Sequence, residues 1–211
     1  MQGKHHIRRA RPATYEKGQV RIEAILDAAA EVLISQGYNK LTLRQIALQA
    51  GITVGNLTYY YRTKEALLAD LLEKILSTYL EEIDRIVEAS GDSPRDRFVA
   101  VVAYLIDDLN TRRTSRFFPE LWALANHDDY AAELMEHIYA QERQALYDLI
   151  IAINPDLDER QSRCLSLYVS CSIEGMTMFL GAGKKQEAAL EPMKQLACKS
   201  FLHLIANPGP G

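Results

Sequence analysis

The chain has 211 residues, of which 48% are hydrophobic, and its formal net charge is −4. This content is enough for a packed core, in one large domain or in a small domain beside a larger one. The three cysteines, Cys164, Cys171 and Cys198, show neither metal-binding spacing nor an even-numbered disulfide framework, which predicts reduced thiols inside a cell. The N-terminus is polar and basic, and no segment approaches the ~20 apolar residues of a membrane-spanning helix. We therefore expect a cytoplasmic protein without a membrane partner.

Charge is distributed unevenly along the chain. Residues 1–64 carry ten Lys or Arg and four Asp or Glu, whereas the remainder carries fourteen basic and twenty-four acidic residues. A basic head on an acidic body is typical of a head that binds an anionic polymer such as DNA. The alternative is a basic tail that only keeps the chain in solution.

Apolar residues recur at helical spacing along most of the chain, and no long alternating strand pattern interrupts them. Helices are expected over about 19–36, 42–50, 54–60, 64–89, 95–109, 113–127, 128–153, 158–180 and 190–206, the sixth being short and interrupted by Pro119. Thr42, Thr53 and Thr63 stand where N-caps are expected, and Gly37 and Gly51 where helices end. The predicted fold class is all-α, with about nine helices.

The second and third predicted helices are both short and are separated by a tight turn at Gly51. Glycine permits the left-handed backbone of such a turn, small Ala47 allows close helix contact, and Ile52 would tie the turn to the core. This spacing is typical of a helix-turn-helix unit. The alternative is two short helices in an ordinary helical bundle.

The segments ILDAAAEVLISQGYNK and LTLRQIALQAGITVGNLTYYYRTKEALL resemble the DNA-binding head of the TetR/AcrR family of bacterial transcriptional repressors. The resemblance covers about residues 20–70. It includes the pairs Ile46–Ala47 and Tyr60–Tyr61, the Ala50–Gly51–Ile52 turn and the Thr63–Lys64–Glu65 helix start. Thr58 departs from the family pattern, which often has Tyr there, and this affects the expected base preference.

The resemblance implies a set of DNA contacts. Base readout would fall to Thr53, Val54, Gly55, Asn56 and Thr58, with Asn56 able to bond adenine in a bidentate manner. Phosphate contacts, which set register, would come from Thr42, Arg44, Tyr59, Tyr60 and Lys64. Tyr61 would belong to the core of the head. The alternative for Tyr59 and Tyr60 is ordinary surface tyrosine.

Three domains are expected: a flexible basic arm at 1–18, a helix-turn-helix DNA-binding domain at 19–64, and a helical ligand-binding and dimerisation domain at 65–211. Arg8, Arg9 and Arg11 in the arm could enter the minor groove of DNA, where narrow stretches attract arginine. The alternative is a disordered tail with nonspecific attraction only.

The body shows no catalytic constellation, because GxSxG, HExxH and phosphate-binding glycine loops are missing from the sequence. His127–Asp128–Asp129 could bind a metal ion, but polar residues at a helix start more often cap the helix. We therefore expect no enzyme, no metal and no cofactor.

In the resembled family the body encloses a small-molecule cavity, and the last two long helices pair with a second subunit. Candidate pocket residues are Tyr104, Phe117, Phe118, Trp122, Tyr139 and Glu174, with Glu120 or Asp107 as a counter-charge for an apolar or cationic ligand. Candidate interface residues are Leu165, Val169, Cys171, Ile173, Leu196, Phe201 and Leu204. For Glu174 a salt bridge at the dimer rim or within the bundle is favoured over a ligand contact.

The predicted function is a DNA-binding transcriptional regulator, a homodimeric repressor that an unknown small-molecule effector releases from an inverted-repeat operator on double-stranded DNA. The alternative is a DNA-bound adaptor of the same fold that recruits a protein partner and has no effector.

Overall fold

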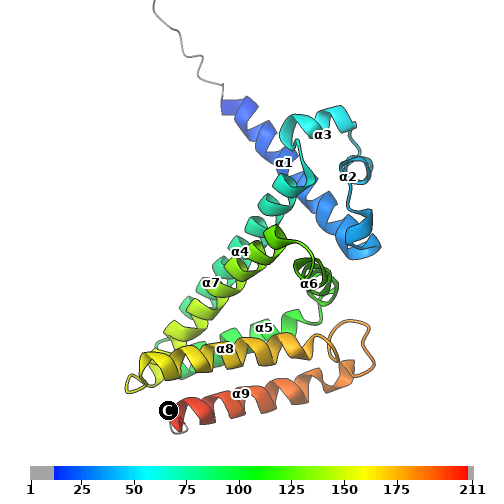
Figure 1. Cartoon of the computed structure of the whole chain (residues 1–211). Coiled ribbons are helices and arrows are strands. Elements are labelled where there is room, and N and C mark those ends of the chain that lie inside the picture. Colours follow the sequence, from blue (N-terminus) through cyan, green and yellow to red (C-terminus); the bar gives the residue numbers. More distant parts are fainter. Residues whose placement is uncertain (1–11, 209–211) are drawn as a thin grey trace, which may run out of the picture. The chain divides into compact units, whose positions relative to one another are not determined.

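The computed structural model describes residues 12–208, and the side chains from residue 17 onward. Its helices are α1 Pro12–Gln36, α2 Leu43–Gln49, α3 Val54–Tyr60, α4 Lys64–Ala89, α5 Pro94–Asp108, α6 Arg112–Ala125, α7 Asp129–Ile153, α8 Glu159–Met176 and α9 Leu190–Ala206 (Figure 1). Two short 3-10 turns, η1 Tyr38–Lys40 and η2 Glu187–Ala189, precede α2 and α9. Within residues 12–208 there is no β-strand, so the predicted all-α class is confirmed. No helix in this range is long and apolar enough to cross a membrane.

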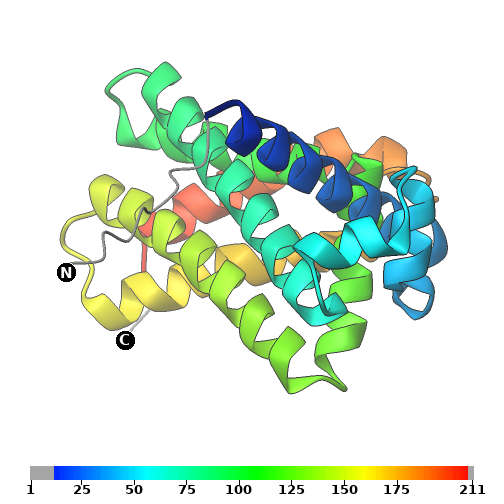
Figure 2. The same ribbon diagram turned by 90° about the horizontal axis from the view of Figure 1, so that it is seen from above.

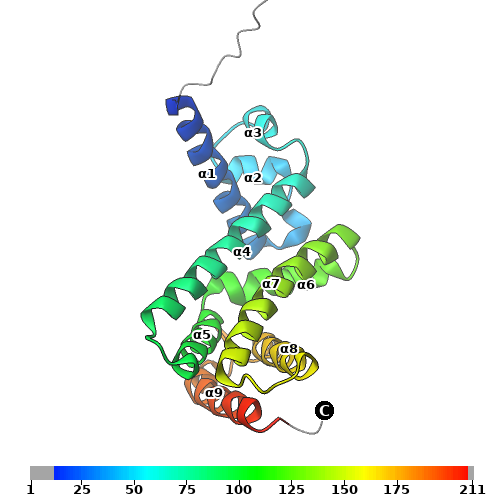
Figure 3. The same cartoon turned by 90° about the vertical axis from the view of Figure 1, so that its left-hand side faces the viewer.

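The chain divides into two compact units, one ending at Leu71 and the other beginning at Leu72, and α4 supplies residues to both. In the first unit, α1, α2 and α3 surround the start of α4 (Figure 3). Fully buried Ile25, Ile46 and Leu57 come from α1, α2 and α3, which makes one core for this unit. The apolar stripes read along the sequence therefore converge on a single interior.

Threonine caps begin three consecutive helices. The side chain of Thr42 accepts a 3.1 Å hydrogen bond from the Gln45 backbone N–H, and Thr53 accepts one of the same length from Asn56. Thr63 accepts from the Ala66 backbone N–H, again at 3.1 Å. Each hydroxyl satisfies an N–H group that the first helical turn leaves free.

Three helix boundaries differ from those that the sequence predicts. α1 begins at Pro12, inside the range expected for the arm, and proline suits a first helical turn because it lacks an N–H group. α6 continues through Pro119, since its buried face holds the helix together on both sides of that residue. α8 ends at Met176 and not near Leu180, because tight turns follow at 177–180.

The second unit packs α5 to α9 with the remainder of α4 around a separate core. Phe98, Val102 and Ile106 on α5 are fully buried there, against Ile173 on α8 and Ile205 on α9. α7 and α8 are joined by a short turn at residues 154–158 (Figure 2). The amide of the asparagine that opens this turn donates a 2.8 Å hydrogen bond to the α9 backbone, which fixes the turn against the last helix.

Candidate DNA-binding surface and body cavity

The turn between α2 and α3 is closed by backbone hydrogen bonds. Gly51 has a φ of 64°, the left-handed conformation that glycine adopts without a Cβ penalty. The Ile52 N–H donates to the Ala47 carbonyl at 2.9 Å, and the Gly51 N–H donates to the Leu48 carbonyl at 3.2 Å. These two bonds form a Schellman motif, which ends α2 and sets the direction in which α3 begins.

The first turn of α3 is open to solvent. Thr53, Val54, Gly55 and Asn56 are all exposed, and Val54 exposes 43% of its surface although it is apolar. Thr58, one turn later, is half-buried, and its hydroxyl donates to the Gly55 carbonyl at 3.2 Å. Four of the five residues predicted to read bases thus lie on one exposed helix start, and the fifth directs its hydroxyl back onto the helix.

The residues predicted to contact phosphate lie before and after this helix start in the sequence. Thr42 and Arg44 are exposed at the beginning of α2. Tyr59 is 82% exposed, and its ring meets that of half-buried Tyr60 edge to face with the centroids 5.1 Å apart. Lys64, the first residue of α4, places its Nζ 4.1 Å above the ring of Tyr38.

The cation–π contact places the lysine charge beside the positive N-terminal end of α4. Both positive charges would attract an anion to this position. Arg8, Arg9 and Arg11 of the predicted arm lie outside the described residues.

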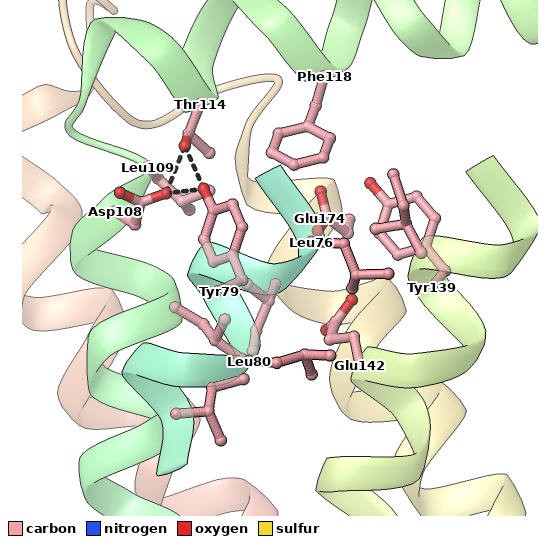
Figure 4. Close-up of a pocket in the computed structure, with 14 residues that line it drawn as sticks. Leu76, Tyr79, Leu80, Asp108, Leu109, Thr114, Phe118, Tyr139, Glu142 and Glu174 are labelled. Atoms are coloured by element: carbon pink, nitrogen blue, oxygen red, sulfur yellow. Dashed lines mark hydrogen bonds between the residues drawn. The ribbon is translucent and has the colours of Figure 1, made fainter. Parts of the chain in front are cut away.

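A cavity of about 50 Å³ lies inside the second unit. On its polar wall the Tyr79 hydroxyl makes two hydrogen bonds (Figure 4). It donates to Asp108, and it lies 2.7 Å from the Thr114 hydroxyl. The apolar wall is contributed by α4, α5, α7 and α8. Its residues are Leu76, Leu80, Ile83, Leu105, Leu109, Ile138 and Ile173.

Three of the six predicted pocket residues line this cavity, namely Phe118, Tyr139 and Glu174. The other three lie elsewhere in the same unit. Phe117 is fully buried in the core, the ring of Tyr104 packs 6.3 Å from that of Tyr79, and Trp122 donates its indole N–H to the Tyr139 hydroxyl at 2.8 Å. Trp122 therefore contacts the cavity wall through one lining residue.

The counter-charges expected for a ligand, Glu120 and Asp107, are not at the cavity wall. The carboxylate of Asp107 instead forms an ion pair with the ammonium group of Lys194, at 2.7 Å, and this pair joins α5 to α9. The acidic residues that do line the cavity are Asp108, Glu142 and Glu174. Glu174 belongs to the cavity wall, a position from which a ligand can be reached.

Tyr79, Thr114, Asp108 and Glu142 are lining residues that sequence reasoning missed. A signal for Glu142 was present, because it lies four residues after Ile138 and seven before Leu149 on the buried stripe of α7. A carboxylate in such a stripe is costly unless it is paired, hydrogen-bonded or protonated.

Burial dominates the titration of both cavity glutamates. It raises the pKa of Glu142 from 4.5 to about 7, while the Ser170 hydroxyl and the Arg143 charge lower it in part. Burial also raises the pKa of Glu174 to about 8; the Glu142 charge adds to this effect and hydrogen bonding with Tyr139 opposes it. Both carboxyl groups thus hold their protons to a far higher pH than exposed glutamates.

Apolar side chains remain exposed on α8 and α9, which lie side by side (Figure 1). Leu167 and Tyr168 on α8 are about half exposed, and Leu196 on α9 is 58% exposed. Of the predicted interface residues, Cys171 is also exposed. Val169, Ile173 and Phe201 are buried in the core of their own unit, and Leu165 and Leu204 are partly buried.

No group of three or more potential metal ligands occurs within the described part of the chain.

Comparison with known proteins connects these features to a family. The model of the bacterial regulatory proteins of the tetR family matches residues 25–71, which include α2, α3 and all three threonine caps. The chain is 27% identical over 158 residues to the HTH-type transcriptional regulator BetI of Stenotrophomonas maltophilia, covering 74% of this chain and 79% of that protein.

Solved structures share the fold over nearly the whole chain. A transcriptional regulator of Pseudomonas aeruginosa PAO1 aligns with a TM-score of 0.75 at 16% identity and covers 97% of both chains. The ketosteroid transcriptional regulator KstR2 of Mycobacterium tuberculosis aligns with a TM-score of 0.61 at 20% identity, over 87% of this chain and 93% of its own.

Proposed function

This chain belongs to the tetR family of bacterial regulatory proteins and is a DNA-binding transcriptional regulator, and we propose that it acts as a homodimeric repressor released by a small-molecule effector. The observation that carries the proposal is the exposed start of α3, held in place by the closed turn at Gly51. Residues 19–64 would bind DNA, and residues 65–211 would bind the effector and the second subunit.

The geometry of α3 supports direct reading of the major groove. A helix that enters this groove contacts base edges with its N-terminal residues, and Thr53, Val54, Gly55 and Asn56 occupy that position. Asn56 is our assignment for adenine recognition, because its amide offers a donor and an acceptor together. Arg44, Tyr59 and the hydroxyls of Thr42 and Tyr60 would bind phosphates beside Lys64.

A second copy of the chain supplies the second recognition helix in this proposal. The apolar side chains exposed on α8 and α9 support pairing of these helices across a dimer interface. Two heads on a twofold axis would place two copies of α3 in successive major grooves, about 34–36 Å apart, on an inverted repeat.

The cavity supports release by an effector. α4 begins with Lys64 in the first unit and supplies Leu76, Tyr79 and Leu80 to the cavity wall. A ligand that favours one position of α4 would favour one separation of the two heads, provided that its affinity differs between the two states. A filled body would instead favour the adaptor alternative, so the cavity supports an effector.

The test is a sequencing-based pull-down of sheared genomic DNA by the purified protein at physiological salt. We expect a few strongly enriched sites that share one inverted repeat. Weak enrichment without a shared repeat would contradict a specific dimeric repressor. An effector that occupies the cavity without weakening operator binding would contradict the release mechanism.

A further inference from the structure

Acidic groups dominate the polar part of the body cavity. Glu142 on α7 and Glu174 on α8 lie between Tyr79 and Tyr139 in the view of Figure 4. Asp108 stands on the opposite side of Tyr79, from which it accepts a hydrogen bond. Three carboxyl groups on three helices therefore face one small space.

Basic side chains are not part of the described cavity wall. Arg143, which acts on Glu142 from a distance, pairs with Glu136, and Arg113 lies over the ring of Tyr79 at 5.5 Å. The Ser170 hydroxyl donates to Glu142 at a long 3.4 Å. The two glutamates are thus partly buried with few donors, an arrangement that disfavours anions and leaves acceptor atoms for a ligand.

We propose that this cavity binds the protonated amine of an alkylammonium ligand, with Glu142 and Glu174 as its counter-charges. The inference rests on the proposed function, because it names the chemical class of the effector. The positive nitrogen would lie between the two carboxylates, and the aromatic ring of Tyr139 would add a cation–π contact. The aliphatic wall made by Leu76 and Leu80 would pack against the alkyl group.

The hydrogen-bonding capacity of the wall selects an amine that carries N–H groups. Carboxylate oxygens are acceptors, and an alkylammonium ion offers three donors, whereas a quaternary ammonium ion offers none. The volume also limits the ligand, because the cavity measures about 50 Å³. The alkyl group that lies beside the ammonium is therefore short.

Binding of the cation is coupled to proton release. In the empty cavity both glutamates retain protons to about neutral pH, whereas the bound cation favours their charged forms. The other titratable groups that face them are Asp108, Tyr79 and Tyr139, and the pKa values of both tyrosines are raised by burial. Affinity should therefore increase as pH rises through the range in which the glutamates lose their protons.

Trp122 provides a built-in reporter for the test. It is the single tryptophan in the sequence, and its indole N–H is bonded to the cavity residue Tyr139. The purified full-length protein is titrated at about pH 8 with butylammonium, butan-1-ol, butyrate and tetramethylammonium, and the fluorescence of Trp122 is followed. We expect butylammonium to bind at least about tenfold more tightly than each of the other three, as charge-assisted hydrogen bonds would give.

The doubly substituted Glu142→Gln/Glu174→Gln variant keeps side-chain volume and removes both charges. We expect it to lose the preference for butylammonium over butan-1-ol, while Glu133→Gln, an exposed glutamate on α7, retains it. The proposal is overturned if butan-1-ol or tetramethylammonium binds wild type as tightly as butylammonium, or if the double variant keeps the preference.

A measurement on wild type alone covers the case in which the double variant does not fold. Calorimetric titration with butylammonium in two buffers of different ionisation enthalpy should show proton release near pH 7, and no release would overturn the proposal. Neither readout uses DNA. Selective binding of butylammonium without any effect on operator affinity would therefore contradict the repressor mechanism and leave this inference standing. Operator release by uncharged ligands alone would contradict this inference and leave the repressor mechanism standing.

Discussion

The hydroxyl of Tyr61 donates a 2.9 Å hydrogen bond to Oδ2 of Asp70, which joins the end of α3 to the second turn of α4. Tyr61 is only 5% exposed, and burial together with the nearby carboxylate raises its pKa. Two residues earlier, Tyr59 is almost fully exposed. The run of three tyrosines therefore faces three environments: Tyr59 and Tyr60 point about 100° apart on α3, and Tyr61 follows the helix in extended backbone.

The first prediction concerns these tyrosine hydroxyls. Tyr61→Phe should lower the stability of the first unit by about 1 kcal/mol, because one partly buried hydrogen bond is lost. Hydrogen exchange of amides in α3 and at the start of α4 measures this loss. Tyr59→Phe is the matched control: it should leave exchange unchanged and weaken DNA binding. Equal exchange in the two variants would show that the bond to Asp70 contributes nothing.

The second prediction separates base reading from phosphate binding. Asn56→Ala should cost about 1–3 kcal/mol of operator affinity and relax the preference at one base pair. Lys64→Ala should weaken binding to all sequences similarly and reduce the salt dependence by about one charge. Binding to a library of operator variants at several salt concentrations distinguishes the two. If both variants lost affinity uniformly, Asn56 would be a phosphate contact.

Local features of the first unit were predictable because their causes lie within a few residues. Thr42 and Thr53 cap helices as their positions predict, and Gly51 adopts the left-handed backbone that its place after α2 requires. Propensity and capping act over one helical turn, so a single sequence contains the information.

The cavity was only partly predictable because it depends on packing between distant segments. Glu142 and Glu174 come from different helices, and their shared environment exists only once α7 and α8 are packed. Trp122 and Phe117 are aromatic residues of the same region, yet neither lines the cavity. Residue type alone does not distinguish a lining residue from core, because Phe117 and Phe118 are adjacent buried residues of α6 and only Phe118 lines the cavity.

The third prediction follows from the buried carboxyl groups. Because folding raises the pKa values of Glu142 and Glu174 above 4.5, to about 7 and about 8, the folded state binds more protons than the unfolded state between these limits. As far as these two groups contribute, the free energy of unfolding should therefore be highest below about pH 4.5 and fall as the pH rises to about 8.

Denaturant unfolding followed by Trp122 fluorescence across this pH range tests the dependence. Glu142→Gln/Glu174→Gln should show a flatter profile and a higher midpoint than wild type near pH 8, because it carries no buried charge. Glu133→Gln, exposed on the same helix as Glu142, should follow the wild-type profile. Parallel profiles for all three proteins would contradict the titration of the cavity pair.

The fourth prediction concerns the loop between α8 and α9. Gly181 has a φ of 103°, and a Cβ at this position would lie 2.3 Å from the Leu109 carbonyl oxygen. That oxygen also accepts a 3.3 Å hydrogen bond from the Ala182 N–H, so the loop is held against the end of α5. Gly181→Ala should cost about 2 kcal/mol or more of unfolding free energy, since backbone must move.

Gly183→Ala is the control in the same loop. Its φ of 74° is also left-handed, but a Cβ there meets nothing within 4 Å. The substitution should cost only the conformational strain of about 1 kcal/mol. Unfolding monitored through Trp122 compares the two variants directly, and equal losses would show that the close approach to Leu109 has no energetic role.

The last prediction tests the dimer through its exposed apolar residues. Leu167 on α8 and Leu196 on α9 are exposed, and removing such side chains from water across an interface would supply about 1.5–3 kcal/mol for each fully buried residue. Leu167→Glu/Leu196→Glu should place charges at that interface and shift the protein from dimer to monomer in light-scattering measurements. Operator affinity should fall with it, because one head alone contacts one half-site. Tyr130→Glu, at an exposed aromatic residue on α7, should remain dimeric. A double variant that kept both its dimer mass and its operator affinity would move the interface away from α8 and α9.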